Sequence, residues 1–166
     1  PRRAAALPRL MRSEHLTLSV VGTGAMGRGI AQIAAQAGCR VLLLDTREGA
    51  AAEAKDALVK QWGKLVEKGK MDAAAAEAAQ ARLEVVADTL ALTYANVVVE
   101  AIVENLEVKR ALFRELDDIV SADCVLATNT SSLSVTSIAA GTRFPGRVAG
   151  FHFFNPVPLM KVVEVV

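Results

Sequence analysis

The sequence predicts an α/β domain in which a doubly wound, mostly parallel sheet carries an inserted helical hairpin. Short apolar runs alternate with helical patterns along most of the 166 residues, which is the order expected of parallel strands joined by helices. The first apolar run leads directly into a glycine-rich turn and a helix. The hydrophobic content of 52% is sufficient for one buried core, so we expect a single domain.

Charge and hydropathy narrow the class of partner. The formal net charge is +1 and the 19 basic residues are scattered, so we expect neither nucleic acid nor a membrane surface as a partner. No apolar run approaches the roughly 18 residues that a membrane-spanning helix needs. A small molecule is therefore the expected ligand.

The first strand is expected at residues 17–21. A helix follows and ends near Ala37, with Gly38 placed to adopt the left-handed conformation after it. From Arg40 to Leu44 the chain forms an apolar run that stops at Asp45. Such a run is typical of a parallel strand that is covered on both faces.

Residues 48–82 are rich in Ala, Lys and Glu, and Lys68-Gly69-Lys70 interrupts them. This stretch is longer than one crossover needs. We therefore expect two helices that project from the domain as a hairpin.

The second half of the chain predicts further strands and two helices. The strands are expected at residues 83–86, 97–100, 124–127, 147–153 and 160–166. The longer helix, 106–120, is capped by Asn105 and has Val108, Leu112, Leu116 and Ile119 on its inner face. A short helix is expected at 134–140. Asn155-Pro156-Val157-Pro158 predicts an extended loop, because each proline disfavours helix in the residue before it.

Gly22, Gly24 and Gly27 form the pattern G-x-G-x-x-G between the first strand and its helix. In this context the first glycine makes the tight turn and the second lets the backbone approach a pyrophosphate. The third lets helix and strand pack closely. The helix N-terminus would then bind the phosphates. The alternative is a strand-to-helix turn without a ligand.

Asp45 ends the second strand about 20 residues beyond the glycines. An acid at this offset accepts hydrogen bonds from the hydroxyls of an adenosine ribose and repels a 2′-phosphate, which favours NAD over NADP. Arg40 and Arg47 could soften that repulsion. A solvated loop acid is the alternative interpretation of Asp45.

Polar side chains follow three strands of the predicted sheet, at the edge where ligands of such sheets bind. Glu104 and Lys109 follow one strand, residues 129–132 follow the next, and His152 and Asn155 follow a third. For residues 129–132 a plain turn is the alternative, because these residue types hydrogen-bond their own backbone.

His152 lies between Phe151 and Phe153, where a histidine is commonly structural. Glu164 lies among valines in a neighbouring candidate strand, where an unpaired carboxylate would be costly to bury. A carboxylate bound to one imidazole nitrogen fixes the tautomer and suits the other nitrogen to proton abstraction. The pattern predicts a His152–Glu164 pair within hydrogen-bond reach. The alternative is Glu164 exposed on an edge strand.

Cys39 and Cys124 are expected to be reduced, structural thiols rather than a disulfide or a metal pair, and no metal site is expected. Residues 1–16 are set aside as a leader or an added segment, because Pro1–Arg12 contains four arginines and no acid. The domain is therefore taken as residues 17–166. No natural stop follows the last apolar run, and we expect the chain to be part of a longer parent protein.

Four segments together resemble the 3-hydroxyacyl-CoA dehydrogenase family. They are Gly-Thr-Gly-Ala-Met-Gly-Arg-Gly-Ile-Ala31, Val-Val-Glu-Ala-Ile-Val-Glu-Asn105, Thr-Asn-Thr-Ser-Ser132 and His-Phe-Phe-Asn-Pro-Val-Pro158. The likeness runs from about Thr17 to Val166, and its His-Phe-Phe-Asn-Pro segment is far more specific than the glycine pattern. It implies an NAD-binding domain of the Rossmann type.

The resemblance also implies an activity, namely the reversible NAD-dependent oxidation of an L-3-hydroxyacyl-CoA to the 3-oxoacyl-CoA in fatty acid β-oxidation. His152 would be the general base, Glu164 would orient it, and Ser131 would hydrogen-bond the reacting oxygen. Lys68, on the hairpin, matches a basic residue that contacts CoA, and a solvated surface lysine is the alternative. Positions matching the family's cofactor contacts are Gly22, Gly24, Ala25, Met26, Gly27, Asp45, Ala101, Glu104, Lys109, Asn129 and Asn155.

Members of that family continue into a helical domain that supplies dimer contacts and one wall of the substrate cleft. This domain is absent from the 166 residues, so we expect part of the active site to be missing and the full-length parent to be a homodimer. The bacterial cytoplasm is the expected location, with the mitochondrial matrix as the alternative. Two other functions stay open. One is a non-catalytic NAD-binding structural or sensing protein of the same family, and the other is a dehydrogenase of small hydroxy acids, which would more typically use a lysine base.

Overall fold

The computed structural model describes residues 12–166, so the arginine-rich segment before Arg12 lies outside the described residues. Ser13–His15 form a short 3-10 turn that contacts the domain, because the Ser13 hydroxyl donates to the carbonyl of Ala37 over 2.5 Å. The domain boundary placed at residue 17 stays a prediction.

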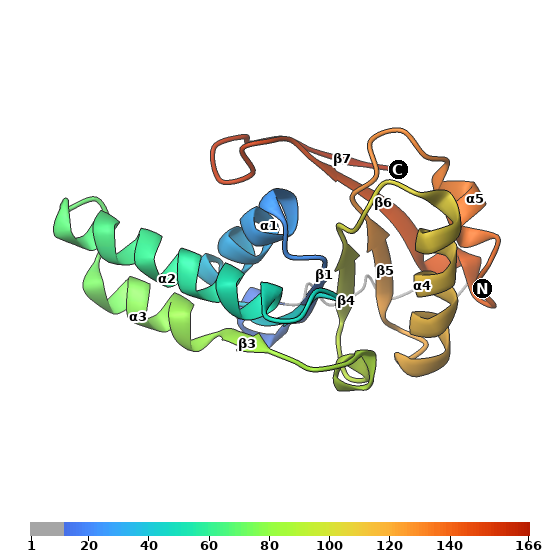
Figure 1. The fold of residues 1–166 in the computed structure, drawn as a ribbon, viewed down its shortest axis with the longest axis horizontal. Coiled ribbons are helices and arrows are strands. Elements are labelled where there is room, and N and C mark those ends of the chain that lie inside the picture. Colours follow the sequence, from blue (N-terminus) through green and yellow to red (C-terminus); the bar gives the residue numbers. More distant parts are fainter. Residues whose placement is uncertain (1–11) are drawn as a thin grey trace, which may run out of the picture.

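Across the described residues, seven strands form one sheet in the order β3-β2-β1-β4-β5-β6-β7 (Figure 1). The first six strands are parallel, and β7 pairs antiparallel with β6. This is the doubly wound, mostly parallel sheet that the sequence predicts. The strands are β1 (Thr17–Val21), β2 (Arg40–Leu44), β3 (Leu83–Val85), β4 (Val97–Glu100), β5 (Val125–Thr128), β6 (Val148–Phe153) and β7 (Val163–Val165).

Helices cover both faces of this sheet (Figure 1). One face carries α1 (Ala25–Gln36), α2 (Ala50–Glu67) and α3 (Ala73–Ala81), and the other carries η2 (Thr89–Leu92), α4 (Leu106–Ile119) and α5 (Val135–Ala139). A last 3-10 turn, η3 (Pro145–Arg147), precedes β6. Two apolar cores therefore lie on either side of the strands.

Strand β2 shows why a continuous apolar run forms a strand in the interior of this sheet. Val41 and Leu43 pack into the core below α1, whereas Leu42 and Leu44 pack into the core below α4. Successive side chains of a strand point to opposite faces, so both faces of this strand need apolar residues.

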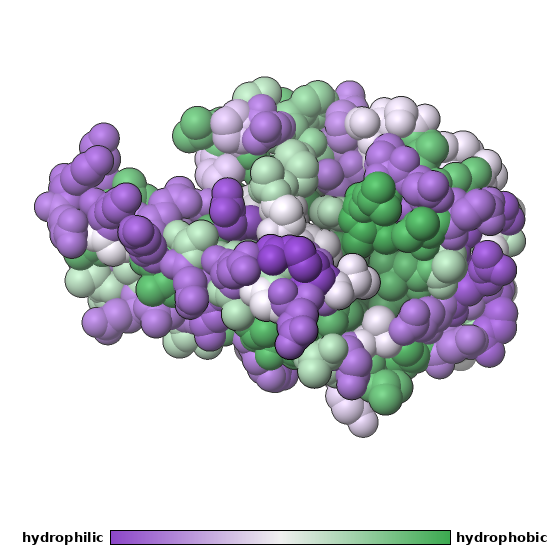
Figure 2. All heavy atoms as spheres, in the orientation of Figure 1, coloured by the Kyte–Doolittle hydropathy of each residue, from purple (hydrophilic) through white to green (hydrophobic). Residues whose placement is uncertain are grey.

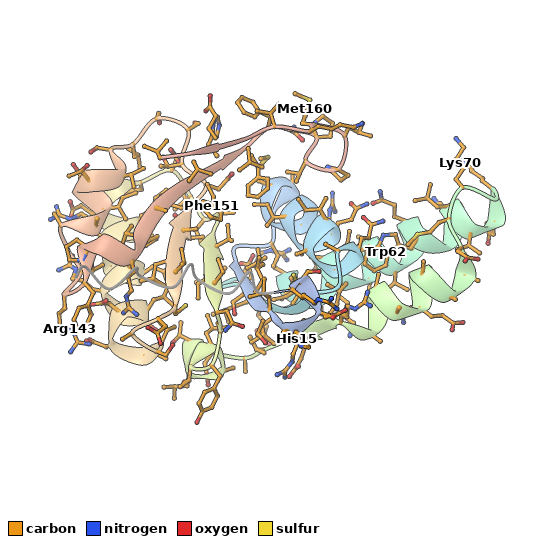
Figure 3. All side chains as sticks on the ribbon, turned by 180° about the vertical axis from the view of Figure 1, so that it is seen from behind. His15, Trp62, Lys70, Arg143, Phe151 and Met160 are labelled. Carbon is orange, nitrogen blue, oxygen red and sulfur yellow. The ribbon has the colours of Figure 1, made fainter. Side chains whose placement is uncertain are left out.

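The predicted helical hairpin consists of α2 and α3, and it projects from the sheet (Figure 1). Trp62, which is 1% exposed, packs into the core, while Lys70 lies at the far end of the hairpin (Figure 3). The hairpin is therefore packed against the domain at least as far along α2 as Trp62, and its tip extends beyond the core.

Three local predictions need correction. The buried face of α4 carries Lys109, Phe113, Leu116 and Asp117, whereas Val108 is 45% exposed, so the helix is rotated from the predicted orientation. Strand β7 is limited to Val163–Val165, because residues 160–162 are not paired. The expected extended loop after β6 is instead a turn, in which the N–H groups of Leu159 and Met160 donate to the Pro156 carbonyl.

Cys39 and Cys124 are both free and buried, as predicted. Burial raises the pKa of the Cys124 thiol to about 11. A thiol in such surroundings stays protonated and behaves as a small apolar side chain.

Candidate active site

The turn between β1 and α1 has glycines where a side chain would collide with the backbone. Gly22 has a φ of +93°, and a Cβ atom there would lie 2.6 Å from the carbonyl oxygen of Ala101. A Cβ atom at Gly27 would lie 1.8 Å from the Gly22 carbonyl oxygen. At Gly24, by contrast, no described atom lies within 4 Å of the Cβ position, so the backbone is open to a ligand.

The N-terminus of α1 is suited to phosphate. Its capping residue is Gly24, which offers no side chain to the first N–H groups of the helix. Helices α4 and α5 differ, since Asn105 and Ser134 accept hydrogen bonds from their first turns. The N–H groups and the dipole at the start of α1 are thus available to an anion.

Asp45 lies at the carboxyl end of β2 and is tied to the glycine turn. One carboxylate oxygen accepts from the N–H and the hydroxyl of Thr23, over 2.7 and 2.8 Å, and the other accepts from the Arg47 N–H over 3.0 Å. Burial raises the pKa of this carboxyl, but these hydrogen bonds outweigh burial and hold the pKa below its usual value. Asp45 is therefore an ionised acceptor beside the turn.

A cavity of about 290 Å³ opens next to Asp45, and its outer wall is apolar. Figure 2 shows apolar side chains gathered on the surface beside the start of α4, where Val103 and Val108 are 65% and 45% exposed. Lining this cavity explains why Val108 is not on the inner face of α4. The lining consists of Gly22, Thr23, Gly24, Asp45, Thr46, Ala101, Ile102, Val103 and Val108.

Sequence reasoning missed Glu100, the last residue of β4, which is fully buried. Its carboxylate accepts from the Ile102 N–H over 2.8 Å, from the Lys109 ammonium over 2.5 Å and from the Thr128 hydroxyl over 2.7 Å. Glu100 therefore joins the ends of two strands to α4 beneath the site. Its position at the end of an apolar strand, with a lysine nine residues later, is the only signal in the sequence.

Glu104 lies above this buried pair and links it to the loop after β5. Its carboxylate is 3.3 Å from the Lys109 ammonium and accepts hydrogen bonds from the hydroxyls of Thr130 and Ser132. Burial raises the pKa of Glu104, but the hydrogen bond from Thr130 and the charge of Lys109 outweigh it, so the pKa is lowered. The loop at 129–132 is therefore held by Glu104 as well as by its own turn.

His152 and Glu164 are paired as predicted. They are directly opposite in the antiparallel register of β6 and β7, and His152 Nδ1 lies 2.8 Å from Glu164 Oε2. The predicted burial of Glu164 is wrong, because its side chain is 59% exposed on the edge strand. The ring of Phe154 packs against the His152 ring with centroids 4.6 Å apart.

A cavity of about 370 Å³ at this edge brings most of the predicted site residues together. Asn129 is fixed there, because its side-chain oxygen accepts from the Phe153 N–H over 2.9 Å. Both His152 and Ser131 line the cavity and also a second one of about 350 Å³, which extends to Glu164. The full lining of the first is Met26, Ala101, Ile102, Glu104, Lys109, Asn129, Ser131, His152, Phe153, Phe154 and Asn155.

Lys68 is the one predicted site residue that the structure leaves apart from the others among those described. It caps the C-terminus of α2, is exposed, and belongs to the turn whose end Lys70 marks in Figure 3. The site at the carboxyl edge of the sheet does not include it.

The family model for the 3-hydroxyacyl-CoA dehydrogenase NAD binding domain matches residues 17–166 of the sequence. The chain belongs to the 3-hydroxyacyl-CoA dehydrogenase family. The matched domain is the NAD binding domain of that family, and NAD is the cofactor of this domain. The glycine turn, the free start of α1 and ionised Asp45 fit that cofactor.

Two relatives and one solved structure illustrate the likeness within the family. The chain is 47% identical over 150 residues to 3-hydroxyadipyl-CoA dehydrogenase of Escherichia coli, covering 90% of this chain and 32% of the relative. It is 42% identical over 151 residues to a probable 3-hydroxybutyryl-CoA dehydrogenase of Deinococcus radiodurans, covering 91% and 54%. The crystal structure of 3-hydroxybutyryl-CoA dehydrogenase from Escherichia coli superposes with a TM-score of 0.88 at 47% identity, covering 90% of this chain and 32% of that one.

The chain thus spans between about a third and about half of the length of these family members. Among residues 12–166, no helix combines the length and the apolar character that crossing a membrane requires. The assignment to the family rests on the domain that is present.

Proposed function

We propose that this chain is the cofactor-binding half of an enzyme that oxidises an L-3-hydroxyacyl-CoA to the 3-oxoacyl-CoA. One observation carries the proposal, namely that His152, which is paired with Glu164, lines the same cavity as the cofactor-side residues Ala101 and Asn129. This arrangement supports a base beside the position that we assign to the substrate hydroxyl and the reactive end of the cofactor. NAD, when bound, supplies the hydride acceptor for this reaction.

The paired carboxylate makes His152 suitable as the base. Glu164 accepts the hydrogen on Nδ1, which leaves the lone pair of Nε2 free to take the proton of the 3-hydroxyl group. As that proton is taken, the hydride leaves C3 and the C3–O bond becomes a carbonyl. The imidazolium that forms is stabilised by the Glu164 charge.

Ser131 is the proposed partner of the reacting oxygen. It lines both cavities beside His152, and its loop is fixed through Thr130 and Ser132 to Glu104. A hydroxyl held in this way orients the substrate oxygen towards His152, and orientation of this kind contributes substantially to rate.

A fourth cavity, also about 290 Å³ in volume but separate from the one beside Asp45, is the proposed path of the CoA arm. It adjoins the cavity of about 370 Å³ at Asn155 and presents the side chains of Arg28, Gln32 and Gln61. Gln61 and Lys68 are seven residues apart on α2, which is two turns and roughly 10 Å along the same side of the helix. This geometry supports a role for Lys68 at the distal end of CoA.

The decisive test is His152→Gln in the full-length protein, assayed with acetoacetyl-CoA and NADH. We expect kcat to fall by roughly 10²- to 10⁴-fold, the usual contribution of a general base, with NADH affinity unchanged. His15→Gln is a matched control, because His15 is the other histidine of the chain and is exposed on η1. Equal kcat for wild type and His152→Gln would remove His152 as the base, and no turnover in the wild type would favour the non-catalytic NAD-binding role instead.

A further inference from the structure

Two arginines flank β2, and each is a candidate to attract the 2′-phosphate of NADP. Arg40 lies at the amino end of the strand and Asp45 lies just beyond its carboxyl end. The Arg40 guanidinium is 2.6 Å from the Glu84 carboxylate on β3. Arg40 is therefore at the wrong edge of the sheet to meet the adenosine ribose.

Arg47 is close enough in the chain to act, since its own N–H donates to Asp45. Its guanidinium, however, binds Glu53 through two hydrogen bonds, Nη1 to Oε1 over 3.2 Å and Nη2 to Oε2 over 2.6 Å. The cavity beside Asp45 is lined by Thr46 but not by Arg47. The cation is thus directed away from the ribose edge.

The position of Glu53 favours this arrangement. Glu53 lies in the first turn of α2, where the helix dipole stabilises a negative charge. The hydrogen bond from Arg47 lowers the pKa of Glu53 further, so the carboxylate is ionised at neutral pH. A bidentate pair of this kind fixes the plane of the guanidinium as well as its charge.

We propose that Glu53 is a specificity-determining residue that keeps Arg47 away from the 2′ position and so preserves the exclusion of NADP by Asp45. To bind a 2′-phosphate, Arg47 has to leave both hydrogen bonds to Glu53. The carboxylate of Asp45 consequently meets that phosphate without compensation. The inference rests on the proposed adenosine site at Asp45.

The test compares the dissociation constants of NADH and NADPH for the wild-type chain and for Glu53→Gln, by fluorescence titration at low salt. We expect NADPH to bind up to about fivefold more tightly to the variant, the scale of an exposed ion pair, and NADH to bind equally to both. The gain should shrink at 0.5 M salt, because the groups are exposed and screened. Adding Arg47→Gln to the variant should abolish the gain.

Glu84→Gln is the matched control, because it breaks an exposed pair of the same 2.6 Å length at the other edge of the sheet and should change neither affinity. An unchanged NADPH affinity in Glu53→Gln, or a gain that persists without Arg47, would overturn the role of Glu53. Failure of the adenosine site itself is distinguished by Asp45→Ala. That variant should weaken NADH by roughly 10- to 100-fold if its carboxylate holds the ribose.

Discussion

Glu100 and Asp117 are buried acids at opposite edges of the same sheet, and their surroundings differ. Glu100 pairs with Lys109 beneath the cavity that holds His152, and Glu104 joins this pair with a side chain that is 40% exposed. Asp117, near the end of α4, accepts from the N–H of Arg143 over 2.7 Å and from the Arg147 guanidinium over 2.5 Å.

The charged groups around Asp117, at the amino edge of the sheet, bind one another and nearby protein groups. The Arg147 guanidinium also donates to the Ser121 carbonyl, and the guanidinium groups of Arg143 and Arg147 lie 5.8 and 5.5 Å from the centre of the Phe144 ring. None of the four cavities described above is lined by Asp117. The comparison teaches that a buried charge marks a functional site only when part of its network faces a cavity.

The largest effect on stability is expected at Glu100. Glu100→Gln leaves the Lys109 ammonium buried beside an amide, and removal of one partner of a buried pair costs about 3–5 kcal/mol of unfolding free energy. Urea denaturation measures this loss. NADH affinity should fall as well, because Ile102, which lines the cavities beside His152 and Asp45, no longer has a charged acceptor for its N–H.

The control for that prediction is the double variant Glu100→Gln/Lys109→Met, in which no ammonium is buried beside the amide. It should regain part of the lost stability. If Glu100→Gln is as stable as the wild type, the ion pair is not the element that holds the ends of β4 and β5 to α4.

Asp117→Asn should be milder and should not reach the ligand. The variant keeps an acceptor for Arg143 and Arg147 but loses charge-assisted hydrogen bonds, and we expect a loss of about 1.5–3 kcal/mol of unfolding free energy. NADH affinity should stay within twofold of the wild type. A parallel loss of NADH binding would show that the two edges are coupled and would undo the comparison.

Most of the fold could be predicted because its strands carry apolar residues on both faces and its turns carry glycine. Thr17–Val21 and Arg40–Leu44 are correct to the residue, and the glycine turn and Asp45 lie together as the spacing of such sheets requires. Lys109 shows where this reasoning ends. A lysine in a helix is normally exposed, so the apolar pattern predicts Val108 on the inner face. In the structure Lys109 is on that face instead, because it pairs with the buried carboxylate of Glu100.

Contacts of the site could be predicted where the pairing of two adjacent strands brings the side chains together. They could not be predicted where they depend on how a helix packs against the sheet. The His152–Glu164 pair follows from two adjacent strands. It does not depend on burial of the carboxylate, because an exposed Glu164 on the edge strand still reaches the histidine. The contact between Arg47 and Glu53 depends on the direction in which α2 leaves the sheet. A single sequence carries no signal for that direction.

The smallest effect on stability is expected from lowering the pH. It distinguishes the two edges of the sheet, because Asp117 titrates at one and Glu104 at the other. Burial raises the pKa of Asp117, but hydrogen bonds from Arg147 and Arg143 outweigh it, so the folded-state pKa lies below its usual value of 3.8. The unfolded chain therefore takes up the proton first, and the stability that ionised Asp117 provides is present above about pH 4 and lost as the pH falls further. Glu104 behaves in the same way below its usual value of 4.5.

We therefore expect the urea midpoint of the wild type to fall between pH 5 and pH 3, and that of Asp117→Asn to fall less steeply over the same range. The variant has no carboxylate left to protonate at position 117, whereas Glu104 still titrates at the carboxyl edge. Glu104→Gln is the matched variant, because it removes the titration beside the cavity and leaves Asp117 in place. If Asp117→Asn and the wild type lose stability in parallel, the ionised Asp117 does not stabilise the folded chain, and the contrast between a closed structural cluster and an open site loses its energetic basis.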